Sequence, residues 1–212
     1  MIISITAPDA PTLKALIDGV QELRQSSPAF GVRIAVELNT SCPNIKGSPP
    51  SGYSFPSLVP LLEVLSKAFK EDSTLTIGLK LPPYVHSDQY DQVISGLQGL
   101  VMGDATPIAY LACTNTLGNS LLLDENLGFA VPTGLGGLGG ESLHALALGN
   151  VLDFKRRLSK AKGLENTKII GIGGVTSKEA VKRMRVAGAD VTGSATLFGK
   201  LGVHAFKVLA EE

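Results

Sequence analysis

Residues 168–174 read Lys-Ile-Ile-Gly-Ile-Gly-Gly, and residues 175–179, Val-Thr-Ser-Lys-Glu, follow them directly. The first part is a short apolar run of the kind that forms a strand covered on both faces. Its glycines predict a tight turn, and Thr176-Ser177 followed by Glu179 is a helix-start signal. This stretch therefore predicts a β-strand, a glycine turn and an α-helix in immediate succession.

The same order of elements recurs along the chain. Nearly continuous apolar runs predict strands over Ile2–Ile5, Arg33–Asn39, Ile77–Leu81, Ile108–Thr114, Lys168–Gly173 and Asp190–Ala195. Apolar residues at helical spacing predict helices over Thr12–Arg24, Pro56–Phe69, Gln89–Leu97, Leu143–Leu158, Ser177–Val186 and Val203–Leu209. Asp9 with Pro11 marks the start of the first helix. Six strand-then-helix units in a row predict an α/β fold with six parallel strands.

Two architectures fit this pattern, an open doubly wound sheet and a (β/α)8 TIM barrel. Polar residues follow the strands all along the chain, as Asn39-Thr40-Ser41-Cys42 and Thr114-Asn115-Thr116 show. Barrel enzymes build their sites from such loops, whereas an open sheet places its site at one switch point. The loops favour the barrel, although a closed barrel needs eight units. Glycine-rich Asn115–Glu141 is expected to be irregular and to cover or form a site, or to be disordered.

Composition limits the classes of function. The 212 residues carry 19 basic and 19 acidic side chains, and 44% are hydrophobic, which predicts one domain over residues 1–212 with a sizeable core. Zero net charge gives no electrostatic attraction to nucleic acid or to anionic lipid. With two cysteines, a disulfide framework is not expected. No leader-like or membrane-spanning pattern is present, so we expect a soluble cytoplasmic protein.

Three segments are candidates for chemistry. In Asn39-Thr40-Ser41-Cys42-Pro43-Asn44, a thiol that could act as nucleophile or base lies between carboxamides that suit a planar ligand. The same residues also fit a purely structural interpretation, in which Cys42 is a small buried side chain followed by a proline turn. Lys80 lies in an apolar strand and could meet an anionic ligand, or extend to water from the strand end.

The third candidate is a pair of glycine-rich strand ends. Gly171-Ile172-Gly173-Gly174 and Gly193-Ser194-Ala195-Thr196 end consecutive strands, and their backbone N–H groups could bind a phosphate. Turns also need glycine, so each segment alone is a weak signal. His86, His144 and His204 have no metal-ligand spacing, and no metal site is expected.

Taken together, the segments resemble dihydroorotate dehydrogenases, in particular the soluble class 1 enzymes that use a cysteine. The resemblance rests on Glu37–Asn44, Lys80–Tyr84, Thr114–Asn119, Gly136–Gly140, Ile170–Gly174 and the region of Thr196, in the same order and spacing. It implies a (β/α)8 flavoprotein that oxidises dihydroorotate to orotate on FMN in pyrimidine (UMP) biosynthesis. Fumarate is the electron acceptor that the resemblance implies.

The resemblance also implies a role for individual residues. Cys42 would be the base that removes the C5 proton while hydride leaves C6 for the flavin. Asn39, Asn44, Asn115 and Thr116 would bind the pyrimidine, with Thr116 where serine is common. Cofactor contacts would come from Asn39, Lys80, Thr114, Gly140, Gly173, Gly174, Ala195 and Thr196, the last four around the phosphate.

Two features depart from the family pattern. Ala195 stands where glycine is usual, and its β-carbon is expected to be tolerated if its φ angle is negative. The chain resembles the family only from the third barrel strand onward, which predicts an N-terminally incomplete barrel without the first two βα units.

Two other functions stay open at this point. One is a catalytically inactive barrel fragment that needs a partner chain or the missing N-terminal segment. The other is a related flavin-dependent pyrimidine reductase, which shares the cysteine loop. A homodimer is also open.

Overall fold

A computed structural model describes residues 1–41, 50–103 and 105–210 of the chain. The strands are β1 (Ile2–Ile5), β2 (Ala35–Asn39), β3 (Thr76–Leu81), β4 (Tyr110–Cys113), β5 (Leu117–Leu121), β6 (Leu135–Leu138), β7 (Lys168–Ile172) and β8 (Val191–Gly193). The helices are α1 (Ala10–Gln25), α2 (Phe55–Glu71), α3 (Ser87–Gln98), α4 (His144–Leu158), α5 (Lys178–Ala187), α6 (Thr196–Leu201) and α7 (His204–Leu209). Short 3-10 turns occur at Gly31–Arg33, Ser51–Tyr53 and Gly140–Leu143.

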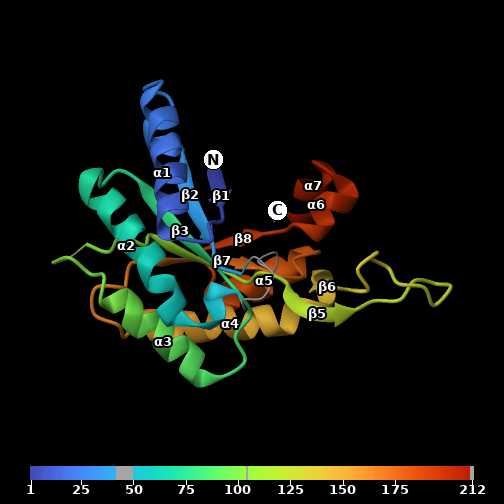
Figure 1. Ribbon diagram of the computed structural model, residues 1–212. Helices are drawn as coiled ribbons and strands as arrows, with labels where there is room; N and C mark the ends of the chain where they lie inside the picture. The colour runs from blue at the N-terminus through green and yellow to red at the C-terminus, as the bar shows by residue number, and fades with distance from the viewer. Residues whose placement is uncertain (42–49, 104, 211–212) are drawn as a thin grey trace.

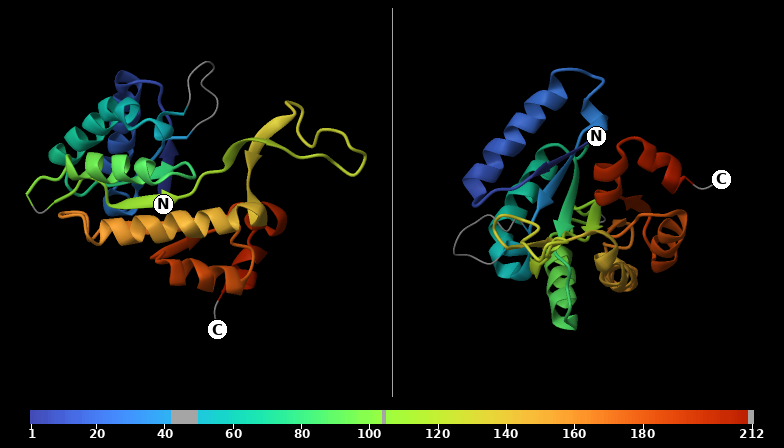
Figure 2. Two further views of the ribbon diagram at one scale, coloured as in Figure 1. Left: turned by 90° about the horizontal axis from the view of Figure 1, so that it is seen from below. Right: turned by 90° about the vertical axis from the view of Figure 1, so that its right-hand side faces the viewer.

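Six strands form one parallel sheet in the order β1-β2-β3-β4-β7-β8, so each strand pairs with the next one along the chain. Helices α1 to α5 likewise pack each against the next, and they form an outer layer around the curled sheet (Figures 1 and 2). A doubly wound sheet would reverse its strand order at a switch point, and this sheet does not. The fold is therefore a partial (β/α)8 barrel, and the predicted six parallel strands are confirmed.

The two faces of the sheet differ in chemistry because side chains alternate along each strand. Val36 and Leu38 of β2, with Ile77 and Leu79 of β3, are fully buried in the core that the strands share with the helices. The intervening residues face the barrel interior, and the strand register brings Glu37, Asn39, Gly78, Lys80 and Tyr110 together there. The interior face is thus polar where it approaches the carboxyl ends of the strands.

The predicted helix starts are confirmed. Asp9 Oδ1 accepts a hydrogen bond from the N–H of Thr12 at 2.8 Å, with Pro11 in the first turn of α1. Ser177 Oγ accepts from the N–H of Ala180 at 3.2 Å at the start of α5. These caps satisfy N–H groups that have no partner inside the helix.

Two expectations are corrected by the structure. The stretch Asn115–Glu141 is not wholly irregular, because β5 and β6 pair there as an antiparallel hairpin. We call residues 117–138 the β5–β6 arm, which extends away from the barrel (Figure 2, left). Its strands were not predicted because glycines break the apolar pattern. Helix α6 was not predicted either, since its six residues are too few to show a helical period.

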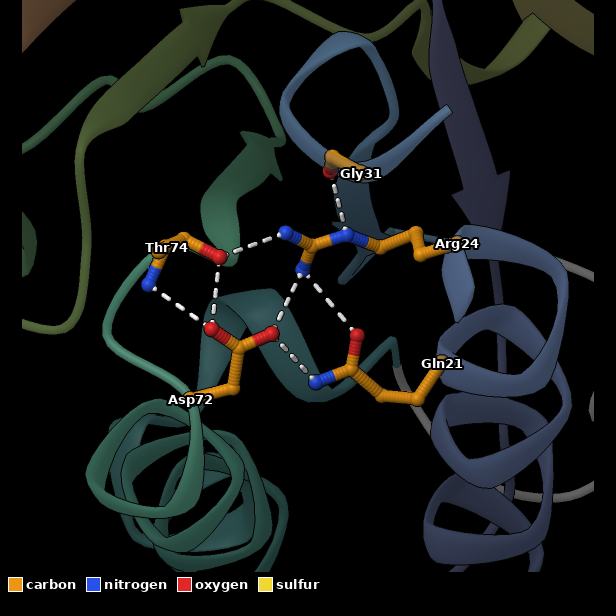
Figure 3. Close-up of polar contacts among 5 residues, drawn as sticks. All are labelled: Gln21, Arg24, Gly31, Asp72 and Thr74. Atoms are coloured by element: carbon orange, nitrogen blue, oxygen red, sulfur yellow. Dashed lines mark hydrogen bonds and ion pairs between the residues drawn. The ribbon is translucent and has the colours of Figure 1, made fainter. Parts of the chain in front are cut away.

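Arg24 of α1 is the centre of a cluster of polar contacts in the N-terminal part of the chain (Figure 3). Its guanidinium is almost wholly buried and donates to Gly31 O at 2.7 Å, Gln21 Oε1 at 3.0 Å and Thr74 Oγ1 at 2.9 Å. Asp72 Oδ2 lies 3.2 Å from its Nη1 and neutralises the charge. The cluster ties α1 to the segment between α2 and β3.

Replacing Arg24 by methionine should lower the free energy of unfolding by about 2–3 kcal/mol, because Thr74, Gly31 and Asp72 lose their shared donor. Urea unfolding measures the difference. Lys14→Met is the matched control, since Lys14 pairs with Asp18 on the exposed face of the same helix and should change stability little. Equal losses in the two variants would contradict the importance of the buried cluster.

The same cluster predicts a pH dependence. Hydrogen bonds from Thr74 hold the pKa of Asp72 below its ordinary value of 3.8. The unfolded chain therefore binds this proton at higher pH than the folded chain does. The stabilisation is complete above pH 3.8 and is lost as pH falls through the lowered pKa. Urea unfolding between about pH 5 and pH 2 should show a shallower acid loss for Asp72→Asn. If Asp72→Asn loses stability with falling pH as steeply as the parent chain, this pH dependence is contradicted.

Candidate active site

Residues selected from the sequence gather at the carboxyl ends of the barrel strands. Asn39 ends β2, Thr114 and Asn115 follow β4, Gly173 and Gly174 follow β7, and Ala195 and Thr196 follow β8. A cavity of about 150 Å³ lies among them. Its lining includes Lys80, Thr114, Asn115, Thr116, Gly140, Gly173, Gly174, Ala195 and Thr196. Nine of the residues selected from the sequence therefore meet at one cavity.

Asn39 adjoins this group through hydrogen bonds to Asn115 and Ser41. Asn115 Nδ2 donates to Asn39 Oδ1 at 3.0 Å and to Ser41 Oγ at 2.6 Å. The N–H of Ser41 donates to the same Asn39 oxygen at 3.2 Å. Among the described residues, no hydrogen bond uses Asn39 Nδ2. Asn39 therefore has donors left for a ligand carbonyl, whereas both Asn115 donors are already used.

Cys42 and Asn44 lie outside the described residues, but the chain on either side of them is well anchored. Thr40 N and Oγ1 both donate to Lys80 O, at 3.1 and 2.8 Å. On the far side, Gly52 N donates to Thr40 O at 2.7 Å, and a β-carbon on Gly52 would lie 2.6 Å from Thr40 Oγ1. Tyr84 OH donates to Gly52 O at 2.6 Å.

Tyr84 is itself held by Asn150 of α4. The Asn150 side chain accepts from Tyr84 N at 2.8 Å and donates to Tyr84 O at 3.0 Å. Sequence reasoning quoted Tyr84 only within the lysine segment and missed Asn150. A carboxamide on the buried face of a helix, where apolar residues are the rule, was the available signal.

Lys80 brings a positive charge to the interior end of the cavity. No salt bridge among the described residues includes it. Burial raises the pKa of Glu37, and the nearby Lys80 charge partly opposes that rise. Burial also raises the pKa of Tyr110, with a further increase from Glu37. Gly78 lies between them, and a β-carbon there would be 2.1 Å from the Tyr110 ring.

Three glycines give the cavity a wall of bare backbone. Gly140, Gly173 and Gly174 have φ angles of +67°, +134° and +63°, which residues with a β-carbon rarely adopt. A β-carbon on Gly174 would lie 2.6 Å from His144 Cβ and 2.8 Å from Gly140 O. Ala195 also lines the cavity and has a φ of −101°, so the condition under which its β-carbon is expected to be tolerated is met.

His144, at the start of α4, supports the glycine wall from behind. Its Nδ1 lies 2.8 Å from Gly173 O, and Arg183 Nε donates to its Nε2 at 3.0 Å. Sequence reasoning passed over His144 because it has no metal-ligand spacing. His144 acts through a contact with Gly173, which is 29 positions away in the sequence. No local sequence pattern could have predicted that contact.

The hydroxyl group of Thr114 is a buried polar group in the lining of the cavity. Thr114 is buried, its N–H donates to Ile172 O at 2.7 Å, and its Oγ1 has no hydrogen-bond partner among the described residues. Leaving a buried hydroxyl unpaired costs about 1–3 kcal/mol. Because Thr114 lines the cavity, a bound polar ligand is the natural partner for this oxygen.

Cys113 is the cysteine that the structure describes. It is fully buried among apolar side chains, and burial raises the pKa of its thiol far above the usual value. A buried neutral thiol is unreactive. Cys113 is therefore part of the core.

Residues 1–41, 50–103 and 105–210 contain no helix with the length and apolar character that a membrane crossing requires. Over the same ranges, no three His, Cys, Asp or Glu side chains lie close enough together to hold a metal ion.

Comparison with known proteins gives one consistent result. The family profile described as dihydroorotate dehydrogenase matches residues 15–212. A putative dihydroorotate dehydrogenase A (fumarate) of Streptococcus agalactiae is 31% identical over 178 residues, which is 84% of this chain and 53% of that protein. A probable dihydroorotate dehydrogenase A (fumarate) of Streptococcus pneumoniae is 34% identical over 178 residues, with coverages of 83% and 52%. The chain spans about half the length of these curated relatives.

A solved structure supports the fold. DHODH from Eimeria tenella, crystallised in complex with ferulenol, matches with a TM-score of 0.61 at 16% identity. The match covers 94% of this chain and 61% of that one. At this identity the similarity concerns the barrel architecture alone.

Proposed function

Because this chain belongs to the dihydroorotate dehydrogenase family, we propose that it oxidises (S)-dihydroorotate to orotate with FMN as cofactor and fumarate as electron acceptor. This reaction would serve pyrimidine (UMP) biosynthesis in the cytoplasm. The observation that carries the proposal is the cavity at the strand ends, where Lys80, the unpaired Thr114 hydroxyl and the glycine wall face one space.

The residues present fit FMN. The Thr114 oxygen lacks a partner among the described residues, and Gly173 and Gly174 line the cavity with backbone that carries no side chain. Lys80 offers a positive charge without a salt-bridge partner among the described residues. The cavity volume of about 150 Å³ is below the ~300–1,000 Å³ typical of cofactor sites. It would accommodate one end of the cofactor, with the rest in the open barrel mouth.

Each end of the cofactor would meet a different set of groups. The backbone of Gly173, Gly174, Ala195 and Thr196 would hold the phosphate, because N–H groups of bare backbone bind anions well. Thr114 and Gly140 would contact the middle of the molecule. Lys80 and Asn39 would lie at the ring, where a positive charge stabilises developing negative charge.

The substrate would lie between the ring and the Cys42 loop. Asn39, Asn44, Asn115 and Thr116 would bind its carbonyl and imide groups. Bound FMN would supply the acceptor for the hydride that leaves C6 of dihydroorotate. Cys42 would take the C5 proton as general base.

The visible absorption spectrum of the purified chain tests the proposal directly. Bound oxidised flavin makes the protein yellow, and anaerobic addition of dihydroorotate should bleach the flavin band. Fumarate should then restore the band. A colourless chain would contradict the proposal and favour an inactive fragment. Faster bleaching by dihydrouracil than by dihydroorotate would indicate a pyrimidine reductase.

Thr114→Val gives a further prediction. Without flavin, the variant should be as stable as the parent chain or up to about 1 kcal/mol more stable, because the unpaired hydroxyl is gone. Its FMN affinity should fall about 10-fold, because the ligand loses that partner. Thermal unfolding and flavin fluorescence titration measure the two effects. Lower stability with unchanged FMN affinity would show that the hydroxyl is structural.

A further inference from the structure

The peptide group between Gly173 and Gly174 is fixed from one side by a side chain. His144 Nδ1 lies 2.8 Å from Gly173 O, and the His144 ring is buried. His144 comes from α4, whereas the glycines follow β7. The contact therefore links two segments that are far apart in sequence at the wall of the cavity.

The hydrogen-bond partners of the ring decide which nitrogen carries the proton. Arg183 Nε can only donate, and it lies 3.0 Å from His144 Nε2. Nε2 must therefore accept, which leaves the proton of the neutral ring on Nδ1. His144 thus donates to the carbonyl of Gly173, and Arg183 fixes the ring in the form that can do so.

A held carbonyl also sets the direction of the neighbouring N–H. In a planar trans peptide the C=O and the following N–H point to opposite sides. Since Gly173 O is directed to His144, the N–H of Gly174 points away from the imidazole. Gly174 lines the cavity, and its N–H makes no backbone hydrogen bond among the described residues. Both residues that flank this peptide are glycines, so without a β-carbon on either side it could rotate if nothing held it.

We propose that His144 is a positioning residue that aims the Gly174 N–H at the cofactor phosphate, with Arg183 keeping its imidazole in the donating form. The inference rests on the proposed function, because it takes FMN as the ligand. It goes beyond it by assigning the orientation of the phosphate-binding backbone to a side chain that does not touch the ligand.

Two replacements of His144 separate hydrogen bonding from packing. In His144→Asn, the side-chain N–H is the same number of bonds from Cβ as Nδ1 and can still reach Gly173 O. His144→Leu fills similar space without a donor. Lys182→Met is the control for Arg183→Met, because it removes the neighbouring charge on α5, and among the described residues the His144 ring is hydrogen-bonded to Gly173 and Arg183 and not to Lys182.

The measurement is the affinity of each variant for FMN and for riboflavin, from quenching of flavin fluorescence. Riboflavin lacks the phosphate but shares the ring and ribityl chain. We expect His144→Leu to weaken FMN binding about 10-fold and to leave riboflavin binding unchanged. His144→Asn should restore FMN binding to within about 3-fold of the parent chain. The FMN affinity of Arg183→Met should lie between those of His144→Leu and His144→Asn. Lys182→Met should bind FMN as tightly as the parent chain does.

Other results would overturn the inference. Equal losses for FMN and riboflavin in His144→Leu would indicate general damage to the cavity. Failure of His144→Asn to restore FMN binding would show that the Nδ1 donor is not what matters. In both cases the parent chain still binds FMN, so the proposed function stands.

A parent chain that binds no FMN would instead contradict the proposed function, and a second measurement then decides the inference. Inorganic phosphate is titrated into glycine-labelled protein while the amide resonances are followed by NMR. A shift of Gly174 in the parent chain and in His144→Asn, but not in His144→Leu, supports the inference. The same shift in all three, or none in the parent chain, overturns it.

Discussion

Cys42→Ala is expected to give a yellow protein in which dihydroorotate reduces the flavin far more slowly than in the parent chain. Cys42 is proposed to take the C5 proton, and loss of a positioned general base slows a reaction about 10²–10⁴-fold. The flavin should remain bound, because its proposed contacts come from Lys80, Thr114 and the glycine wall. Anaerobic stopped-flow measurement of flavin bleaching checks the rate, and the visible spectrum checks the cofactor.

Cys113→Ala is the matched control for this result. Cys113 is fully buried in the core, so the variant should lose some stability and keep the rate of flavin bleaching. Bleaching at the parent rate in Cys42→Ala would rule out Cys42 as the base. Loss of the yellow colour in that variant would show instead that Cys42 has a structural role.

Gly174→Ala is expected to abolish flavin binding, with an affinity loss of about 100-fold or more. The new methyl group would meet Gly140 O at 2.8 Å and His144 Cβ at 2.6 Å, and the φ of +63° is strained for alanine. The peptide must therefore move, and the N–H that is proposed to face the phosphate moves with it. Such a loss corresponds to about 2.7 kcal/mol or more of binding free energy. Flavin fluorescence titration and the colour of the purified protein measure it.

Gly149→Ala provides the comparison. Gly149 lies in α4, and a β-carbon there has no atom within 4 Å. This variant should keep its flavin and gain about 0.5–1 kcal/mol in stability, because alanine favours a helix interior. If Gly174→Ala also keeps its flavin, the glycine wall is not the phosphate site.

The barrel could be predicted from the sequence because its strands are covered on both sides. Continuous apolar runs such as Ile77–Leu81 mark such strands, and each has a parallel partner in the structure. The ends of the strands were predicted less accurately than their presence. The predicted strand starts at Ile108 with the apolar run, whereas β4 starts at Tyr110. The β5–β6 arm and α6 could not be predicted, because glycines and short length leave no period to detect.

The grouping of candidate residues was predictable where they end or follow a strand. Asn39, Lys80, Thr114 and Asn115 were selected from their places in the strands and loops and from the family resemblance, and the structure brings them together because the carboxyl ends of parallel strands meet at one face. Residues that act through other residues were missed. His144 and Asn150 lie on one helix and hold Gly173 and Tyr84 by contacts that only the folded chain creates.

The β5–β6 arm has a consequence for how stability measurements on this protein are interpreted. Leu122, Leu127 and Phe129 are more than half exposed, and no residue of the arm belongs to the buried core cluster. The arm can therefore open and exchange its amide hydrogens while the barrel stays folded. The chain has no tryptophan, and its tyrosines, Tyr53, Tyr84, Tyr90 and Tyr110, all lie in the barrel. Intrinsic tyrosine fluorescence would therefore report the unfolding of the barrel and would not detect the opening of the arm.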